Sequence, residues 1–277
     1  MKKLLAIVLA AAMLCAAMLT MLSCGSDSTK TEETTAADTK TTLIMATNAN
    51  FPPYEYKEGN GYAGIDVEIA TEIAKKLGMT LEIKDVEFGS IVAGVQTGKY
   101  DIGMAGMTVN DERKQQVNFS DSYAKGIQVV IVKEGSEYKS VDDFFVLDAE
   151  GNHTAVKEGV LVGVQQNTTG DIYCSDTLEN FGFGEDKVKR YSNGADAVAA
   201  LASGKLSAVV IDDQPAKEFV KANEGLTILE GSYADEDYAI AVGKENSELL
   251  EKINKALKEL TDDGTIAKIV AKYIKAE

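Results

Sequence analysis

The sequence predicts an α/β fold made of two similar lobes with a cleft between them. Short apolar strands alternate with amphipathic helices along most of the chain, which is the pattern of parallel sheets. The segments QTGKYDIGMAG (96–106) and ASGKLSAVVID (202–212) share one order: the end of a helix, then Gly, Lys and a strand. Because this pattern occurs twice, we expect two lobes with the same arrangement of helices and strands.

The chain opens with an apolar run that follows Lys2 and Lys3 and ends at Ser23 and Cys24. Residues 1–23 therefore predict a lipoprotein signal peptide, after whose removal Cys24 would be lipidated. The run is also long enough to persist as an anchor helix, and this alternative stays open. Both interpretations place the rest of the chain outside the cytoplasmic membrane. Residues 24–42 are polar without an apolar period and predict a flexible tether.

The first lobe begins with the apolar strand that opens the folded body. Its first helix is predicted from Ile69, Ile73 and Leu77, which recur at four-residue spacing before Gly78 stops the helix. We expect strands at 43–47, 80–85 and 100–105, and helices at 64–78 and 90–97.

The second lobe repeats this alternation after a β-branched strand at 126–133 leaves the first. Residues 140–160 read as a polar loop or hairpin insertion. We then expect strands at 160–165, 188–191 and 206–211, and helices at 169–181 and 194–202.

A strand at 238–242 is suited to crossing back to the first lobe, and 248–274 is helical with one break at 262–264. The predicted lobes are 43–127 plus 238–277, and 128–237. Two crossings would put a central cleft at the carboxyl ends of the strands, where ligands bind in such folds and where hinge closure can occur.

Composition excludes several classes of function. The chain is acidic, with 28 Lys+Arg against 44 Asp+Glu, and no basic stripe accompanies its aromatics, which argues against a nucleic-acid partner. Of three cysteines, Cys174 alone lies in the folded body, so no internal disulfide is possible there. One histidine, His153, cannot supply a zinc site or a catalytic triad near the cleft. The glycines of 181–186 follow a helix, the wrong order for a phosphate loop. We expect no metal and no cofactor.

The most informative stretch is AGMTVNDERKQQVNFSDSY (105–123). It places Arg113 a few residues after a strand that ends in Gly106 and Thr108. A guanidinium can hold an α-carboxylate through two parallel hydrogen bonds, and nearby carbonyl and hydroxyl oxygens can accept from an ammonium. Recognition of a free α-amino acid needs this grouping. From the residues alone, Arg113 capping a helix or pairing with Asp111 stays an open alternative.

Four further segments lie around this stretch: ATNANFPPYEY (46–56), GIDVEIATEIAKKLG (64–78), VEFGSIVAGVQTGKYDIGMAG (86–106) and DEDYAIAV (235–242). Together, in this order, they resemble the bacterial family 3 solute-binding proteins, the amino-acid receptors of ABC importers. The resemblance implies a two-lobed, periplasmic-binding-protein-like fold of type II with two crossover strands. It implies a non-enzymatic receptor that binds a free L-amino acid and delivers it to a membrane permease. We expect a monomer, lipid-anchored outside the cytoplasmic membrane.

The resemblance also assigns roles to the backbone clamp of the ligand. Arg113 would take the carboxylate with help from the Thr108 N–H, and the Gly106 carbonyl with the Thr108 hydroxyl would receive the ammonium. The family places an acid from the second lobe opposite the ammonium. Asp212 is favoured for this role, and its neighbour Asp213 is the alternative.

The remaining expected site residues surround the ligand side chain. Phe51 and Phe88 correspond to the aromatic walls of the family, although aromatics are core residues more often than ligand contacts. Asn48 stands where many relatives carry an acid, which points to a neutral ligand side chain more than a basic one. In the second lobe, Gln165, Thr168 and Thr169 occupy the corner between a strand and a helix, where the Thr169 N–H would suit the carboxylate and Gln165 would touch the side chain.

Two alternative functions use the same fold. One is an enzyme similar to a cyclohexadienyl dehydratase, for which Glu55, Glu87 and Asp212 are possible general acids, although nothing marks them as catalytic. The other is a ligand-sensing protein that reports to a partner receptor. The sequence shows no signalling segment after Ile274, which disfavours a self-contained sensor.

Overall fold

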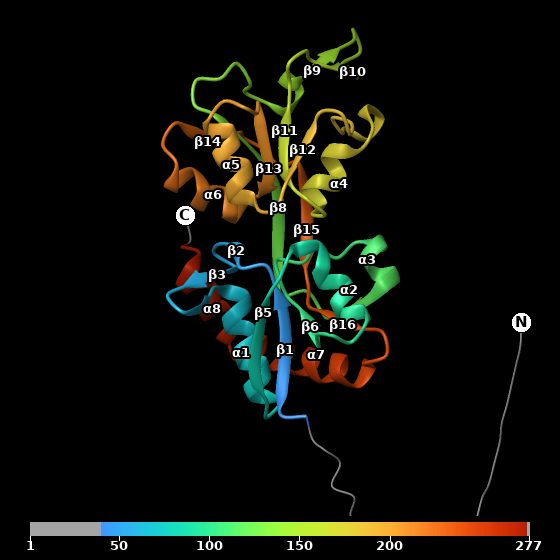
Figure 1. The fold of residues 1–277 in the computed structure, drawn as a ribbon, viewed down its shortest axis with the longest axis vertical. Coiled ribbons are helices and arrows are strands. Elements are labelled where there is room, and N and C mark those ends of the chain that lie inside the picture. The colour runs from blue at the N-terminus through green and yellow to red at the C-terminus, as the bar shows by residue number, and fades with distance from the viewer. Residues whose placement is uncertain (1–39, 276–277) are drawn as a thin grey trace, which may run out of the picture. The chain divides into compact units, whose positions relative to one another are not determined.

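Two mixed sheets, joined by a pair of long strands, organise residues 40–275, the part of the chain described by the computed structural model (Figure 1). From Lys40 onward the chain packs as one compact unit. The predicted signal peptide and Cys24 lie outside the described residues. Of the predicted tether only residues 40–42 are described, and Thr42 is already the first residue of a strand. Among the described residues, no helix is both long enough and apolar enough to span a bilayer.

The first lobe is built on a five-stranded sheet in the order β5-β1-β6-β16-β7. Strands β1, β5 and β6 are parallel, whereas β16 is antiparallel to both of its neighbours. Its elements are β1 (Thr42–Thr47), α1 (Ile65–Lys76), β5 (Thr80–Asp85), α2 (Ile91–Gln96), β6 (Ile102–Gly103), α3 (Asp111–Gln116), β7 (Val117–Phe119), β16 (Ala241–Gly243), α7 (Ser247–Asp262) and α8 (Thr265–Tyr273). A small sheet of β2 (Asn50–Phe51), β3 (Glu55–Glu58) and β4 (Gly61–Ala63) follows β1.

Helix α1 shows why these residues form these elements. Ile65, Ile69 and Ile73 are fully buried on one face, and burying such a side chain contributes about 1.5–3 kcal/mol. Acidic residues stand in the first turn and lysines in the last, which complements the helix dipole. Gly78, with φ of 69°, then takes the left-handed conformation that ends the helix.

The second lobe is built on a six-stranded sheet in the order β12-β11-β13-β8-β14, with β15 also paired to β8. Its elements are β8 (Ala124–Lys133), β9 (Phe145–Leu147), β10 (His153–Val156), β11 (Val162–Gln165), α4 (Thr169–Ser175), β12 (Val188–Tyr191), α5 (Gly194–Ala202), β13 (Ala208–Asp212), α6 (Asp213–Ala222), β14 (Leu226–Ile228) and β15 (Ala234–Tyr238). The polar insertion is the hairpin β9–β10.

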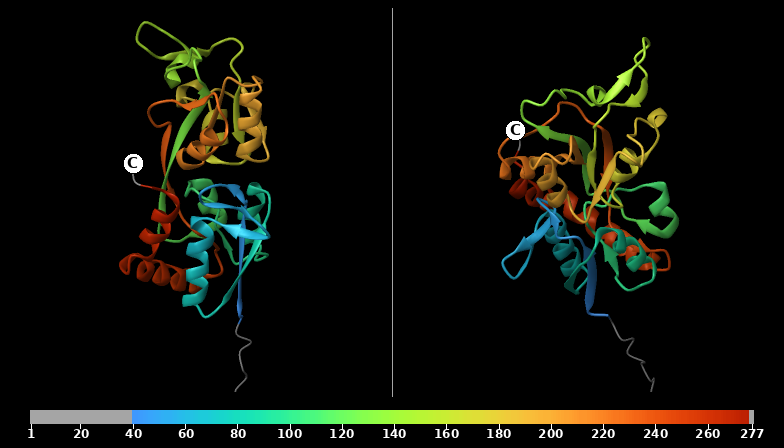
Figure 2. Two further views of the ribbon diagram at one scale, coloured as in Figure 1. Left: turned by 90° about the vertical axis from the view of Figure 1, so that its left-hand side faces the viewer. Right: turned by 45° about the horizontal axis from the view of Figure 1, so that its top comes forward.

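Strands β8 and β15 carry the chain between the lobes. They are antiparallel partners from the Ala124–Tyr238 pair to the Gln128–Ala234 pair, so the two crossings lie side by side (Figure 2, left view). The prediction that 238–242 crosses back was wrong, because β15 makes this crossing and residues 241–243 already belong to the first sheet. The exact lobe boundaries at 127/128 and 237/238 stay a prediction.

One predicted helix is also too long. The helix expected at 169–181 ends at Ser175, because the Asp176 carboxylate accepts hydrogen bonds from the Thr177 N–H (2.7 Å) and from the Asn180 side chain (3.2 Å). These bonds stabilise a separate short turn in place of a continued helix. The other predicted helices and strands are present, with ends that differ by a few residues.

A cavity between a buried arginine and a buried acid

All ten predicted site residues line one cavity, together with Glu55 and Ala105: Asn48, Phe51, Phe88, Gly106, Thr108, Arg113, Gln165, Thr168, Thr169 and Asp212. The cavity measures about 310 Å³, a volume that includes space open to solvent. Asn48 follows β1, Gly106 follows β6, and Gln165 and Asp212 end β11 and β13. The carboxyl ends of strands from both sheets thus meet at this point, as the sequence predicted.

Arg113 is held in place by its own short helix and by both lobes. The side chain of Asn110 caps α3 by accepting from the Arg113 N–H at 2.8 Å. The guanidinium is 6% exposed and donates from Nη1 to the Thr108 carbonyl at 2.7 Å and from Nη2 to the Asn167 carbonyl at 3.2 Å. Burial lowers the Arg113 pKa, against the opposing effect of Glu236 and Asp212. The alternative of a surface pair with Asp111 is wrong, because Arg113 is buried.

Thr108 presents its N–H on the side of Arg113. Thr108 and Tyr238 form an antiparallel bridge in which the flanking residues make the hydrogen bonds, Val109 N–H to Asp237 O and Ala239 N–H to Met107 O. In such a pair the N–H and C=O of the central residue point away from the partner strand. Since the Thr108 carbonyl accepts from Arg113, its N–H lies on the same side. This orientation suits a carboxylate bound at the guanidinium.

Gly106 must be glycine for two reasons. Its φ is +51°, and a Cβ there would lie 2.8 Å from Cε1 of Phe51. Its N–H donates to Oδ2 of Asp66 at 2.9 Å, so the peptide is fixed from behind by a buried carboxylate. The Gly106 residue can therefore approach a ligand closely with its orientation already set.

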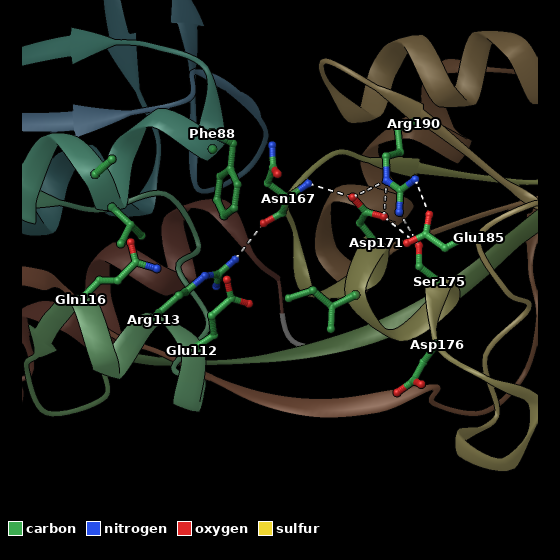
Figure 3. A pocket seen from close by; sticks show the side chains of 14 residues that line it. Phe88, Glu112, Arg113, Gln116, Asn167, Asp171, Ser175, Asp176, Glu185 and Arg190 are labelled. Atoms are coloured by element: carbon green, nitrogen blue, oxygen red, sulfur yellow. Dashed lines mark hydrogen bonds and ion pairs between the residues drawn. The ribbon is translucent and has the colours of Figure 1, made fainter.

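The two predicted aromatic walls lie in the first lobe. Phe51 is 9% exposed and stacks on Tyr54, with ring centroids 6.0 Å apart. Phe88 is half-buried, and its ring centre is 5.2 Å from Cζ of Arg113, a cation–π contact visible in Figure 3. Phe88 thus also orients the guanidinium.

Asn48 and Gln165 connect the lobes across the cavity. The Gln165 amide donates to Oδ1 of Asn48 at 2.9 Å and to the Ser192 carbonyl at 3.3 Å, while Nδ2 of Asn48 donates to the Val86 carbonyl at 2.8 Å. Both amides already have protein partners. Their positions at the cavity were predicted, but this bond between the two residues was not.

The second-lobe corner brings a residue that the sequence did not single out. Thr168 caps α4 and Thr169 is 3% exposed. Between Gln165 and Thr168, Asn167 takes a left-handed conformation with φ of 65° and turns its carbonyl toward Arg113 (Figure 3). Asparagine tolerates this conformation better than most residues, the one signal by which its role could have been recognised.

The structure separates the two candidate acids. Asp212 is 7% exposed and accepts a hydrogen bond from the Tyr238 hydroxyl, whereas half-buried Asp213 pairs with Gln214 and Lys217 on its own helix. Burial, together with the charge of Glu236, raises the Asp212 pKa to about 7. Only Asp212 lines the cavity.

Three further buried acids were not predicted as site residues: Glu55, which lines the cavity, and Asp66 and Glu236, which lie beside it. Glu55 and Asp66 are at most 1% exposed, and each has one carboxyl oxygen without a hydrogen-bond partner among the described residues. Asp66 accepts hydrogen bonds from the Gly106 N–H at 2.9 Å and from the Tyr123 hydroxyl at 2.8 Å, both of which favour its charged form. Burial raises the pKa of Asp66 to about 7 and that of Glu55 well above its ordinary value.

A larger hollow of about 1110 Å³, again including open solvent, lies outside the cavity between α2, α3 and α4 (Figure 3). Phe88 and Arg113 line both spaces. Three other charged groups of this outer hollow are engaged with each other, because Arg190 pairs with Asp171 and Glu185, both at 2.8 Å. We therefore regard the hollow as the entrance and the smaller cavity as the candidate site.

No metal or nucleophile chemistry is evident among residues 40–275. No cluster of His, Cys, Asp and Glu there has the arrangement of a metal site. His153 stacks on Phe145 in the hairpin insertion and contacts Asp142 at 2.8 Å. Cys174 is fully buried, and burial raises its pKa, which keeps the thiol protonated and unreactive.

Known proteins share this fold and sequence over nearly the whole chain. The arginine-binding extracellular protein ArtP of Bacillus subtilis (strain 168) is 32% identical over 93% of this chain and 93% of its own. A probable histidine-binding protein of Neisseria gonorrhoeae is 32% identical, covering 97% of this chain and 96% of its own. The structure of an ancestral arginine-binding protein bound to arginine matches with a TM-score of 0.74 at 40% identity, over 85% of this chain and 99% of that one.

Two more observations complete the comparison. An ancestral amino acid-binding protein described as a precursor of cyclohexadienyl dehydratase matches with a TM-score of 0.73 at 32% identity, over 85% of this chain and 96% of its own. The family model of the bacterial extracellular solute-binding proteins, family 3, matches residues 43–276. With the two-lobed fold and this match, the chain belongs to the bacterial extracellular solute-binding proteins, family 3.

Proposed function

We propose that the protein is the substrate-binding receptor of an ABC importer, which binds a free L-amino acid between its lobes and delivers it to a membrane permease. The observation that carries this proposal is the pair of opposite charges at one cavity. Arg113 contributes a buried cation from the first lobe, and Asp212 a buried acid from the second. A zwitterion with one carboxylate and one ammonium complements this pair.

The proposed contacts follow the geometry of these groups. Arg113 and the Thr108 N–H bind the α-carboxylate, with the Thr169 N–H facing it from the second lobe. The Gly106 carbonyl, the Thr108 hydroxyl and Asp212 receive the α-ammonium. Charge-assisted hydrogen bonds contribute roughly 1.5–3 kcal/mol each. Four or five of them contribute about 6–15 kcal/mol in total, enough over most of that range to cover the roughly 8 kcal/mol of a micromolar complex and the cost of closing the lobes.

Basic amino acids come first among the ligands to test. Asn48 alone points to a neutral side chain, but Glu55 lines the same cavity and supplies an acid that can ionise beside a cation. Phe51 and Phe88 can flank the aliphatic part of a long side chain. The named ligands of two similar proteins, arginine and histidine, agree with this order.

The cavity gives no support to an enzyme, the alternative raised by the dehydratase precursor among similar structures. Of the three possible general acids, Glu87 is exposed and does not line the cavity. Glu55 is buried beside Asp66, and Asp212 faces the proposed ammonium position. We therefore propose a receptor without catalytic turnover. We also propose that it is monomeric and that a lipid on Cys24 anchors it outside the cytoplasmic membrane. A gene neighbourhood with permease genes would separate the importer from the sensing role.

The test is ligand binding by the purified protein after unfolding and refolding, which removes any amino acid carried through purification. Thermal shift with each of the twenty amino acids should raise the melting temperature for one or a few of them, because binding stabilises the native state. Calorimetric titration then gives the affinity. Binding of none of the twenty would overturn the proposal, and turnover of a cyclohexadienyl acid would replace it with the enzyme.

A further inference from the structure

Glu236 is a buried acid on the returning crossover strand, outside the set of residues that line the cavity. It is 6% exposed and belongs to β15, where it pairs in register with Gly126 of β8. Its Oε2 accepts from the Thr108 hydroxyl at 2.9 Å and from the Gln128 amide at 3.0 Å. Its Oε1 has no hydrogen-bond partner among residues 40–275. A buried carboxylate with an unused oxygen is costly and calls for a role.

The bond to Thr108 decides what that hydroxyl can offer a ligand. A carboxylate can only accept, so the Thr108 hydroxyl must use its one proton on Glu236. Only the lone pairs of the hydroxyl remain for the ligand, so Thr108 can act toward the ligand as an acceptor and not as a donor. An α-ammonium has three N–H groups for Thr108, the Gly106 carbonyl and Asp212. An α-hydroxyl has a single proton and would leave acceptors unpaired.

Glu236 also sets the charge of the neighbourhood. The titratable groups that face it are Arg113 from α3, Asp212 from β13, Tyr238 from its own strand and Tyr173 from α4. Arg113 is the one Lys, Arg or His among the buried residues that the structure describes. Two acids therefore share a single cation. Asp212 lies opposite Gln128 in the β13–β8 pair, and the Gln128 amide donates to Glu236, so the two buried acids are neighbours. Burial and the Glu236 charge raise the Asp212 pKa to about 7, which leaves a proton there for a ligand ammonium to displace.

We propose that Glu236 is a positioning residue that makes the site selective for α-amino over α-hydroxy ligands and causes ligand binding to release a proton. This inference rests on the proposed function. It acts through Thr108 and Asp212 and needs no contact between Glu236 and the ligand.

The experiment measures binding and proton release together. The probes are L-arginine and its 2-hydroxy analogue, 2-hydroxy-5-guanidinopentanoic acid, with L-histidine as second amino acid. Titration calorimetry near pH 7 in two buffers of different ionisation enthalpy gives the number of protons released. For the wild type we expect about half a proton per ligand near pH 7, falling toward zero above pH 8, since Asp212 is then already ionised. The amino acid should bind at least about tenfold more tightly than the hydroxy acid.

Glu236→Gln keeps the size of the side chain and removes its charge. Its amide can donate to Thr108, so amino-acid affinity should fall about tenfold or more, with loss of selectivity over the hydroxy acid and of most proton release. Glu236→Asp should restore part of both properties. Asp235→Asn neutralises an exposed acid on the same strand and should leave both unchanged. If Glu236→Gln does not fold, Thr108→Val tests the selectivity by removing the hydroxyl.

The outcomes separate this inference from the proposed function. If the wild type binds amino acids and Glu236→Gln keeps the same selectivity and the same proton release, the proposed role of Glu236 is overturned. The proposed function is not affected by that outcome. Equal losses in Asp235→Asn also overturn it, because they would show an effect of net charge. A wild type that binds none of the twenty amino acids overturns the proposed function, and this role with it.

Discussion

The two lobes bring opposite charges to the cavity, and they hold them in different ways. In the first lobe, Arg113 bonds to the carbonyl of Thr108, five residues earlier, and stacks on Phe88 of the same lobe. In the second lobe, Asp212 ends a central strand and takes its hydrogen bond from Tyr238, on the strand that returns to the first lobe. The cation is therefore fixed mainly by its own lobe, with one longer bond to Asn167 of the other, whereas the acid depends on pairing between distant segments. Ligand affinity should therefore fall more when Arg113 is removed than when Asp212 is removed.

The largest effect should come from Arg113→Ala. Loss of two charge-assisted hydrogen bonds to the ligand carboxylate should weaken binding about a hundredfold or more, as measured by titration calorimetry. Arg190→Ala is the matched control, because Arg190 is ion-paired to Asp171 outside the cavity and belongs to the other lobe. We expect it to change affinity by less than about threefold. Similar losses in both variants would contradict the assignment of the carboxylate site to the first lobe.

Asp212→Asn should rank second. One charge-assisted bond to the ammonium is lost and an isosteric amide remains, so affinity should fall about tenfold to a hundredfold. Asp213→Asn provides the control one residue away, where the carboxylate pairs with Lys217. A larger loss in Asp213→Asn than in Asp212→Asn would show that the other acid faces the ligand.

Phe88→Ala sharpens the comparison within the first lobe. It removes an apolar wall of the cavity and the ring beside the Arg113 guanidinium, which together should weaken binding about tenfold. Phe181→Ala is a suitable control, since Phe181 is 65% exposed and lies outside the cavity. If calorimetry gives the same affinity for Phe88→Ala and the wild type, the Phe88 ring does not contribute to ligand binding.

The smallest effect concerns the pH dependence of stability without ligand. Asp66 and Asp212 have pKa values raised from an ordinary 3.8 to about 7. The stability that they contribute is complete below pH 4 and is lost as the pH rises toward 7, because the folded state holds protons that the unfolded chain has released. The melting temperature should therefore fall between pH 4 and pH 7, at about 2–4 °C for each kcal/mol of stability lost. Asp66→Asn should flatten the fall; an unchanged slope would contradict this origin.

The sequence predicted those parts of the fold whose pattern is local. Strand β5, helix α5 and the two C-terminal helices follow from apolar spacing and from glycine stops, and they lie where expected. Strand β15 could not be recognised in this way. Its sequence ADEDY contains three acids and little β propensity, and it is a strand because it pairs with β8.

The candidate site divides in the same manner. Arg113, Thr108 and Gly106 belong to one continuous stretch, so their spacing was readable as a unit. Glu236 reaches Thr108 across 128 positions of the chain, and no local pattern specifies such a contact. The choice between Asp212 and Asp213 likewise needed the structure, because adjacent residues differ in burial only once the end of β13 and the start of α6 are placed.

The side-by-side pairing of β8 and β15 has a consequence for the modularity of the chain. The polypeptide leaves the first sheet and re-enters it at facing positions, so the second lobe is topologically an insertion into the first. Opening the chain at these positions and closing the gap with a tight turn would give two continuous polypeptides. Each could carry one half of a split reporter, and an amino acid that bridges Arg113 and Asp212 would bring the halves together.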